Sequence, residues 1–497
     1  MTSTGRIPVS VVIQHSSPSD CWIVVNGKVY DLTKFAPNHP GGAHIIHKWA
    51  GRDGSSAYND FHAADLIENE LSTEEKKGAL DESTIDDAWR ESSQDKSSPS
   101  PQNISNMNEK PPLSTLINLH DFEEAFGRFG SQKAWAYTWA ASNDLISLNL
   151  NKSWWSKILF RPRIMRDVSA INTKATMLGA EVSMPVFICP MGIAKTAGPE
   201  GEMALGSGAA NAGIVHCMST TASFSAEEIL TSVPPTYPYF FQLYVDRTRS
   251  KTEALLSRLE AFANIKAIFV TVDLAVVSKR EADERLVVSE QVYTSSDGQV
   301  SGADKKGAGL ARTTGNFIDW KLSWSDIPWL RRHTTKPLVI KGVQSAVDAK
   351  LALELGCAGI VVSNHGGRAL DGAPGTVGIL LELRRDCPEV FDRMEVFVDG
   401  GVRRGSDILQ AVCLGARGVG VGRPFQCSVM YGKEGVEHAA LLLQDELETA
   451  MRLCGVTDLG KVRGDLSYLN TVELERFLPP RPSWSWKSWF GARQSKL

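Results

Sequence analysis

Short apolar runs separated by longer amphipathic stretches dominate the chain from residue 184 onward. Eight of these runs have the length of a buried strand. They cover residues 186–189, 214–218, 239–243, 267–272, 337–340, 359–362, 395–398 and 418–421. Strands that alternate with helices pair in parallel, and eight such units close into a ring. The pattern therefore predicts an α/β fold of the TIM (β/α)8 barrel type, with an open doubly wound sheet as the alternative.

Polar or glycine-rich groups follow nearly every predicted strand at its C-terminal end. A single polar residue at such a place often only meets water, but eight groups in equivalent positions favour a closed barrel, whose catalytic groups gather at those ends. The groups are Pro190-Met191-Gly192, Ser219-Thr220-Thr221, Gln242 with Tyr244, Thr271 with Asp273, Lys341, Ser363 with His365 and Arg368, Asp399 with Gly401 and Arg403, and Gly422 with Arg423.

The hexapeptide Ser363-Asn364-His365-Gly366-Gly367-Arg368 places a candidate base three positions from a fixed cation. An arginine can bind a carboxylate through two parallel hydrogen bonds, and paired glycines permit tight turns close to a planar ligand. A carboxylate such as Asp273 against the imidazole would favour its protonated form. Alone, the hexapeptide could be an ordinary loop. Beside the other strand ends, it predicts a site for a hydroxy acid.

A smaller α+β domain precedes the barrel. Strand-like residues 21–25 and 28–30 flank Asn26-Gly27, a strong hairpin signal. A Pro-Gly-Gly turn follows His39 and holds it at a loop tip, and His62 lies beyond helical segments. Each histidine could simply be a surface residue, but two facing imidazoles could bind one metal. Residues 91–112 contain almost no large apolar residue, which predicts a flexible linker.

Composition limits the classes of function. The 497 residues are too many for one typical domain, and 53 basic against 57 acidic residues, a formal charge of -4, give no electrostatic case for nucleic-acid binding. Eight cysteines without metal-site or redox spacing indicate reduced thiols in an intracellular protein. No run approaches membrane-spanning length, and residues 1–10 lack a secretory or mitochondrial pattern. The ending Ser495-Lys496-Leu497 predicts peroxisomal import by the corresponding receptor.

Residues 9–70, with the segment DCWIVVNGKVYDLTKF and the His-Pro-Gly-Gly motif, resemble the cytochrome b5 family. The resemblance implies that His39 and His62 are the axial ligands of a haem b iron. An iron with both axial positions filled by protein has no vacancy for oxygen, so this domain is expected to carry single electrons.

The motifs FQLY, TVD, IKGV, SNHGGR, VDGGVRRG and GVGRP resemble the FMN-dependent 2-hydroxy acid dehydrogenases and oxidases over about residues 116–478. Joined to the haem domain, they resemble the flavocytochrome b2 family, whose members are L-lactate:cytochrome c oxidoreductases. The expected organisation is a haem domain at 5–88, a linker at 89–112, an FMN-binding barrel at 113–478, and a tail at 479–497 that carries the import signal.

The family resemblance assigns roles to residues of this chain. His365 is the base with Asp273 behind it, Arg368 and Tyr137 hold the substrate carboxylate, Tyr244 holds its hydroxyl, and Arg280 adds positive charge. Lys341 would stabilise the reduced flavin. The FMN-binding residues implied are Pro190, Met191, Gly192, Ser219, Gln242, Thr271, Lys341, Ser363, Asp399, Gly401, Arg403, Gly422 and Arg423, with backbone amides around the last four holding the phosphate.

Three departures from the family pattern concern the substrate. Gly192 and Thr221 stand where relatives commonly carry larger residues, which predicts a roomier pocket and a 2-hydroxy acid longer than lactate. Residues 274–279 replace a loop that in the family contains Pro and Gly, so the sequence does not fix the position of Arg280.

Residues 295–315 form a long connection that we interpret as an active-site cover. The tail, with Trp484, Trp486 and Trp489, is expected to pack on its own or a neighbouring subunit.

Three functions are compatible with these observations. The first is a flavohaem L-2-hydroxy acid dehydrogenase that delivers electrons to a one-electron acceptor, such as a cytochrome c-like carrier. The second is a peroxisomal oxidase that reduces O2 to H2O2, and the third is a haem-binding scaffold with an inactive barrel. By family analogy, a homotetramer and a location in the cytoplasm or the mitochondrial intermembrane space are also implied.

Overall fold

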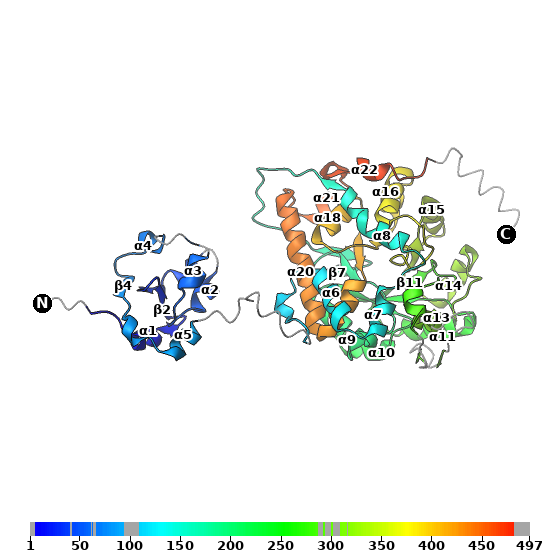
Figure 1. Ribbon diagram of the computed structural model, residues 1–497. Coiled ribbons are helices and arrows are strands. Elements are labelled where there is room, and N and C mark those ends of the chain that lie inside the picture. Colours follow the sequence, from blue (N-terminus) through cyan, green and yellow to red (C-terminus); the bar gives the residue numbers. More distant parts are fainter. Residues whose placement is uncertain are drawn as a thin grey trace. The chain divides into compact units, whose positions relative to one another are not determined.

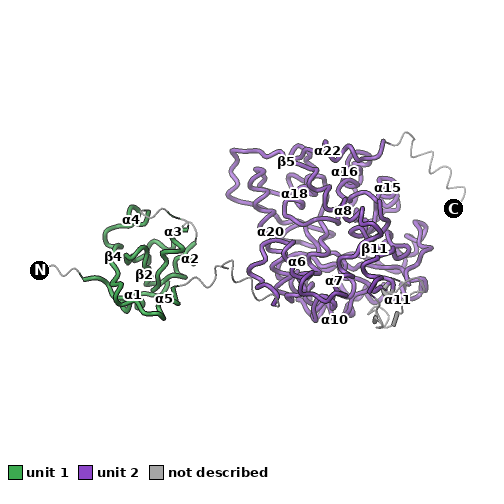
Figure 2. Tube along the Cα trace, viewed as in Figure 1, with its two compact units in different colours: residues 1–108 green, residues 109–497 purple. Residues whose placement is uncertain are grey.

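The computed structural model describes residues 5–39, 42–60, 62, 66–93, 109–286, 292–293, 300–301, 309–315 and 317–481. The chain forms two compact units, residues 1–108 and residues 109–497 (Figure 2). The C-terminal tripeptide and the tail tryptophans lie outside the described residues. In the described part of the chain, no helix has both the length and the apolar composition needed to cross a membrane.

The N-terminal unit is built on an antiparallel sheet of four strands in the order β1-β2-β3-β4. Asn26 and Gly27 connect β2 to β3 with φ angles of 51° and 75°, the left-handed pair that a two-residue hairpin requires, so the hairpin prediction is confirmed. The elements of this unit are α1 Val9–Gln14, β1 Ser16–Ser17, β2 Asp20–Val25, β3 Lys28–Asp31, α2 Ala43–His47, α3 Ser55–Asn59, α4 Leu66–Glu70, β4 Lys76–Ala79 and α5 Asp87–Ser92.

Helix α5 corrects the predicted start of the linker at residue 89. Trp89 lies inside this helix, is 4% exposed, and donates its indole N–H to the carbonyl of Gly51 at 2.9 Å. One buried aromatic residue attaches the segment to the unit although its neighbours are polar, and composition alone does not reveal this. Residues 94–108 of the predicted linker lie outside the described residues.

The larger unit contains a closed barrel of eight parallel strands in the order β10-β11-β14-β15-β16-β17-β8-β9. The barrel prediction is confirmed, and the open sheet is excluded. Three predicted strands have the observed bounds, and the other five overlap the observed strands. The strands are β8 Val186–Ile188, β9 Val215–Ser219, β10 Tyr239–Leu243, β11 Ile265–Thr271, β14 Leu338–Val343, β15 Gly359–Val362, β16 Glu395–Asp399 and β17 Gly418–Val421.

Helices surround the barrel, and the long helix α20 packs against α9 and α18 (Figure 1). The helices are α6 Leu119–Phe129, α7 Gln132–Trp139, α8 Ile146–Ser153, α9 Gly201–Ala212, α10 Ala226–Thr231, α11 Arg249–Glu260, α12 Glu281–Glu284, α13 Leu310–Gly315, α14 Ile327–His333, α15 Ala346–Glu354, α16 Thr376–Asp386, α17 Val390–Arg393, α18 Gly405–Cys413, α19 Arg423–Ser428, α20 Gly432–Leu453, α21 Leu459–Val462 and α22 Val472–Glu475. Short strand pairs are β5 Leu159–Phe160 with β18 Leu469–Asn470, β6 Ala175–Met177 with β7 Ala180–Val182, and β12 Val292–Tyr293 with β13 Val300–Ser301.

Aromatic side chains fill the barrel interior. Phe187 meets Phe240, Phe269 and Phe397 at centroid distances of 6.1, 5.8 and 5.8 Å, edge to face, and all four rings are fully buried. Such contacts stabilise a core in addition to the area they bury. The interior is therefore a packed core, and chemistry is confined to the strand ends.

Candidate active site

The carboxyl ends of the barrel strands surround a cavity of about 1100 Å³, including its open mouth. It collects most of the residues predicted from the strand ends. Those that line it are Tyr137, Pro190, Met191, Gly192, Ser219, Thr221, Tyr244, Arg280, Lys341, His365, Arg368, Asp399, Gly401, Arg403, Gly422 and Arg423. Asp273, Gln242, Thr271 and Ser363 instead support lining residues or one another through polar contacts.

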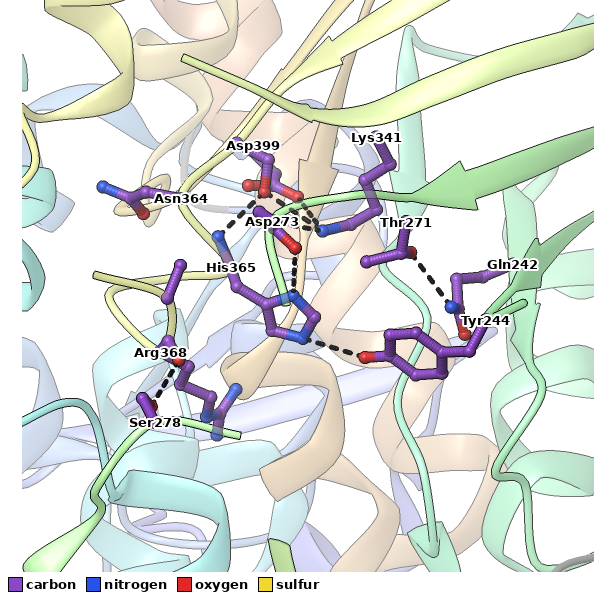
Figure 3. A network of polar contacts seen from close by, with 12 residues as sticks. Gln242, Tyr244, Thr271, Asp273, Ser278, Lys341, Asn364, His365, Arg368 and Asp399 are labelled. Atoms are coloured by element: carbon purple, nitrogen blue, oxygen red, sulfur yellow. Dashed lines mark hydrogen bonds and ion pairs between the residues drawn. The ribbon is translucent and has the colours of Figure 1, made fainter. Parts of the chain in front are cut away.

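His365 forms the centre of a polar network in this cavity (Figure 3). Its Nδ1 lies 3.0 Å from Oδ1 of Asp273, and its Nε2 lies 3.5 Å from the hydroxyl of Tyr244. Burial lowers the pKa of His365 to about 4, against the pull of Asp273. Burial alone would raise the pKa of Asp273, but Lys341 and His365 hold it below its usual range. Near neutral pH the pair is therefore a neutral imidazole held by a carboxylate, which is the form that accepts a proton.

The loop that presents His365 is held by a pair of buried amides. The side-chain amide of Asn151 donates to Oδ1 of Asn364 at 2.7 Å, and that of Asn364 donates back at 3.0 Å. The same Oδ1 of Asn364 accepts the Gly367 amide at 3.0 Å. His365 has a φ of 58°, left-handed backbone that costs free energy for a non-glycine residue, and Gly366 and Gly367 follow in the same region. Sequence reasoning missed Asn151, since nothing local relates it to residue 364.

Two arginines, Arg368 half-buried and Arg423 buried, share carbonyl acceptors at the C-terminal end of α7. The guanidinium of Arg368 donates to the carbonyls of Thr138 and Ala140, and that of Arg423 donates to the same two carbonyls. Burial, with Arg280 adding to it, lowers the pKa of Arg368 to about 10, so the group is still a cation at neutral pH. Arg280 is 6% exposed, and its Nε has no partner among the described residues. The cluster is suited to bind anions.

Lys341 is a buried cation between two carboxylates. Its Nζ lies 3.5 Å from Asp399, 4.0 Å from Asp273 and 3.1 Å from the hydroxyl of Ser363. Although burial alone would lower it, Asp399 and Asp273 raise the pKa of Lys341, so the charge is permanent. A fixed cation here suits a ring that becomes negative on reduction.

The residues expected to hold FMN fit a large polar ligand. Oδ1 of Asp399 and Nε of Arg403 are buried and lack partners within the described chain. A Cβ at Gly422 would meet only Cys189, at 3.6 Å, so this backbone is open to the cavity. The Arg403 amide donates to Asp407 at 2.8 Å, and its guanidinium pairs with Glu123 at 2.7 Å and donates to the carbonyl of Val402 at 2.8 Å. Within the described chain, its Nε is therefore the group left for a phosphate.

Gly192 and Thr221 lie so close together in the cavity wall that a side chain at residue 192 would collide with that of Thr221. A Cβ at Gly192 would lie 2.3 Å from Oγ1 of Thr221, which in turn lies 3.1 Å from Oγ of Ser219. The cavity lining also includes four apolar residues that sequence reasoning did not single out: Leu274, Val277, Ala311 and Ile318.

Two segments whose position the sequence did not predict, residues 274–279 and part of residues 295–315, lie at the cavity. Residues 274–279 lead Arg280 into the cavity. Part of the predicted cover, residues 295–315, returns as helix α13, whose Ala311 and Gly315 line the cavity. Asp283 accepts the amides of Leu310 and Ala311 at 3.2 and 2.9 Å and fixes that helix. Residues 294–299 and 302–308 lie outside the described residues.

In the N-terminal unit, the rings of His39 and His62 have centroids 6.2 Å apart. With metal–nitrogen bonds of about 2 Å on each side, two imidazoles across one iron have centroids roughly 6 Å apart, so the pair fits an axial ligand set. Within the described residues, no group of three or more His, Cys, Asp or Glu forms another candidate metal site.

Comparisons with known families match both units. A model described as FMN-dependent dehydrogenase matches residues 128–468, and one described as cytochrome b5-like heme/steroid binding domain matches residues 9–81. The L-lactate dehydrogenase (cytochrome) of Saccharomyces cerevisiae is 38% identical over 481 residues, covering 94% of this chain and 80% of the relative. Glycolate oxidase 1 of Zea mays is 39% identical over 356 residues, covering 70% of this chain and 95% of the relative.

Solved structures agree with these matches. A flavocytochrome b2 double mutant with pyruvate bound has a TM-score of 0.66 and 37% identity, covering 77% of this chain and 92% of that one. A mandelate oxidase with (S)-4-hydroxymandelic acid has a TM-score of 0.65 and 32% identity, covering 71% of this chain and 98% of that one.

Proposed function

The chain belongs to the FMN-dependent dehydrogenase family, and from this membership we propose that it oxidises an L-2-hydroxy acid to the 2-oxo acid and delivers the electrons singly to an acceptor. It is an oxidoreductase that uses two cofactors, FMN and haem b. FMN, when bound, supplies the two-electron step, and haem b supplies the one-electron steps.

The described side chains divide the work between binding and proton transfer. Arg368 and Arg280 bind the substrate carboxylate, and Tyr244 orients its hydroxyl. Burial raises the pKa of Tyr244, so its phenol stays protonated and can donate a hydrogen bond. Nε2 of His365 accepts a substrate proton, and Asp273, 3.0 Å from Nδ1, stabilises the imidazolium that results.

The observation that carries this proposal is the His365–Asp273 pair beside the Arg368 and Arg280 side chains, in a chain that also holds two neighbouring histidine rings. The test is anaerobic mixing of the holoprotein with a panel of L-2-hydroxy acids while flavin bleaching and haem reduction are followed together. Flavin bleaching followed by haem reduction is the expected result. Failure of every acid to bleach the flavin would refute the proposal and favour a scaffold with an inactive barrel.

An oxidase is the second candidate, because the glycolate oxidase relatives match the barrel unit nearly over their whole length. The haem unit favours the dehydrogenase, since the yeast L-lactate dehydrogenase (cytochrome) also matches across it. Substrate-driven peroxide formation in air, with the haem left oxidised, would support the oxidase.

The substrate is proposed to be longer than lactate. Neither Gly192 nor Thr221 adds a large side chain to the wall, and Leu274, Val277 and Ile318 give the cavity an apolar surface. Each buried methylene contributes about 0.8 kcal/mol, so a longer apolar side chain should outcompete a methyl group. Kinetics with straight-chain acids from lactate to 2-hydroxyoctanoate, and with mandelate, test this. A sharp preference for lactate would contradict it.

Location and partners complete the proposal. The C-terminal Ser-Lys-Leu supports import into peroxisomes by its receptor, with a one-electron carrier or O2 as the acceptor. A homotetramer is proposed from the family resemblance. A fluorescent fusion at the N-terminus, with and without the last three residues, tests the location. An unchanged distribution after their removal would argue against import through this signal.

A further inference from the structure

Two serine hydroxyls form a bridge next to the arginine clamp. Ser142, which follows α7, is 1% exposed, and its Oγ lies 2.8 Å from Oγ of Ser278, which follows β11. The Ser278 hydroxyl lies 2.6 Å from the carbonyl oxygen of Arg368, a contact drawn in Figure 3. The Ser142 hydroxyl lies 2.6 Å from the carbonyl oxygen of Ala369. The two hydroxyls therefore join three segments that are far apart in the sequence.

Backbone hydrogen bonds reinforce the same junction. The Ser142 amide donates to the carbonyl of Gly367 at 2.9 Å, and the Asn143 amide donates to the carbonyl of Lys279 at 3.1 Å. The loop after α7 is thus bonded on one side to the segment that carries Arg368 and on the other to the segment that carries Arg280. Both arginines line the cavity, but neither serine does.

The two hydroxyls are interdependent. Each hydroxyl has one proton, so the two hydroxyls can donate only two hydrogen bonds among three oxygen–oxygen contacts. The arrangement that satisfies most acceptors has Ser278 donating to the Arg368 carbonyl and Ser142 donating to Ser278 or to the Ala369 carbonyl. Removal of either hydroxyl leaves the other with a poorer set of partners in a partly buried place. Their effects on the arginines should therefore not add.

We propose that the Ser142–Ser278 bridge is a positioning device for the carboxylate clamp. It fixes the backbone of Arg368 against the segment in which Arg280 stands two residues after Ser278. The guanidinium of Arg368 is held separately, by the carbonyls of Thr138 and Ala140. The bridge therefore sets the spacing of the two arginines and, through it, substrate affinity. This inference rests on the proposed function, in which the two arginines bind a carboxylate.

The test uses the full-length holoprotein and the variants Ser278→Ala, Ser142→Ala, the double variant and Ser278→Thr, which keeps a hydroxyl. Ser156→Ala is the matched control, because Ser156 is exposed and its hydroxyl donates only locally, to the carbonyl of Ser153 at 2.7 Å. For each protein, kcat and KM are measured with the best L-2-hydroxy acid. The Kd of pyruvate, a carboxylate that is not oxidised, is measured from the change in flavin absorbance, together with FMN content and Tm.

For Ser278→Ala we expect KM and the pyruvate Kd to rise about fivefold while kcat stays within about twofold, the loss expected for one hydrogen bond acting on binding alone. Ser278→Thr and Ser156→Ala should behave like the wild type, and the double variant should lose no more than the more affected single variant. A purely structural role would instead lower Tm or FMN content without raising the pyruvate Kd.

Three results would overturn the inference: an unchanged pyruvate Kd in Ser278→Ala, additive losses in the double variant, or a Thr variant as impaired as the Ala variant. Failure of the proposed function looks different. A wild-type protein that binds pyruvate but oxidises no 2-hydroxy acid would refute the function, while the pyruvate Kd values would still test the bridge. A wild type that does not bind pyruvate would refute both.

Discussion

Replacing Gly192 with alanine tests how the wall of the cavity shares its space with the substrate. A Cβ at this position would lie 2.3 Å from Oγ1 of Thr221 and 3.1 Å from its carbonyl oxygen. The first distance is impossible for real atoms, so the Thr221 side chain must rotate. Rotation breaks its 3.1 Å contact with Ser219 and moves a methyl or a hydroxyl toward the substrate.

The magnitude follows from the volume lost. Space for one methylene is worth about 0.8 kcal/mol, which is about fourfold in kcat/KM. We therefore expect Gly192→Ala to lower kcat/KM for the long acids at least about fourfold relative to lactate, with no change in FMN content. The assay is the kcat/KM ratio across a chain-length series of L-2-hydroxy acids, measured by reduction of an artificial one-electron acceptor.

A second substitution provides the control. In the double variant Gly192→Ala/Thr221→Ala, Oγ1 is gone, and the nearest atoms to the new methyl are the carbonyl oxygen and the Cβ of residue 221, at 3.1 and 3.2 Å. A shift of a few tenths of an ångström then accommodates the methyl, so the preference for long acids should return. If Gly192→Ala leaves the chain-length ratios as they were, the wall does not limit the substrate and the reasoning fails. An equal loss for lactate and for the long acids would count against it in the same way.

Three further predictions follow from the electrostatics. Asp273→Asn should lower kcat at least about a hundredfold, because the His365 imidazolium loses the carboxylate that stabilises it. The haem absorbance should change little. An unchanged rate of flavin reduction in stopped-flow measurements would contradict this. Lys341→Met should lower the flavin reduction potential, on the order of tens of millivolts, in spectroelectrochemical titration, and an unchanged potential would show that the cation does not act on the ring. Burial lowers the pKa of His216 to about 3, well below the ordinary value near 6.5. As the pH falls, the histidine is therefore protonated in the unfolded chain before it is protonated in the folded protein. The free energy of unfolding then falls between about pH 6.5 and pH 3, by at most about 1.4 kcal/mol per pH unit. His216→Leu should flatten the fall of Tm between pH 7 and pH 5, and an unaltered slope would exclude His216 as its source.

Sequence periodicity predicted the barrel because each strand is a short local signal. Tyr239–Leu243, Gly359–Val362 and Gly418–Val421 are apolar runs that end at Gly or polar residues, and burial on both faces requires such runs. The strand ends then bring His365, Asp273 and Lys341 together, because parallel strands share one edge. This part of the site is thus a consequence of topology.

Other parts could not be predicted, since they depend on pairs that are distant in the sequence. Asn151 in helix α8 pairs with Asn364, and Ser142 pairs with Ser278. All four are ordinary polar residues, and no spacing in the sequence marks them as partners. Trp89 was missed for the opposite reason, since one buried ring within a polar segment does not change its composition. Polar pairs and single anchors become visible only when the fold brings the segments together.

The end of α7 connects the two arginines that we propose for substrate binding and for phosphate binding. The carbonyls of Thr138 and Ala140 accept hydrogen bonds from both Arg368 and Arg423, so one piece of backbone orients both guanidinium groups. A displacement of this backbone must therefore affect carboxylate binding and FMN retention together, whereas loss of the Ser278 hydroxyl affects the Ser142–Ser278 bridge and the spacing of Arg368 and Arg280. The α7 carbonyls thus act on both substrate and FMN binding, whereas the Ser142–Ser278 bridge acts on substrate binding alone. A serine variant that raises KM without loss of FMN would show this difference.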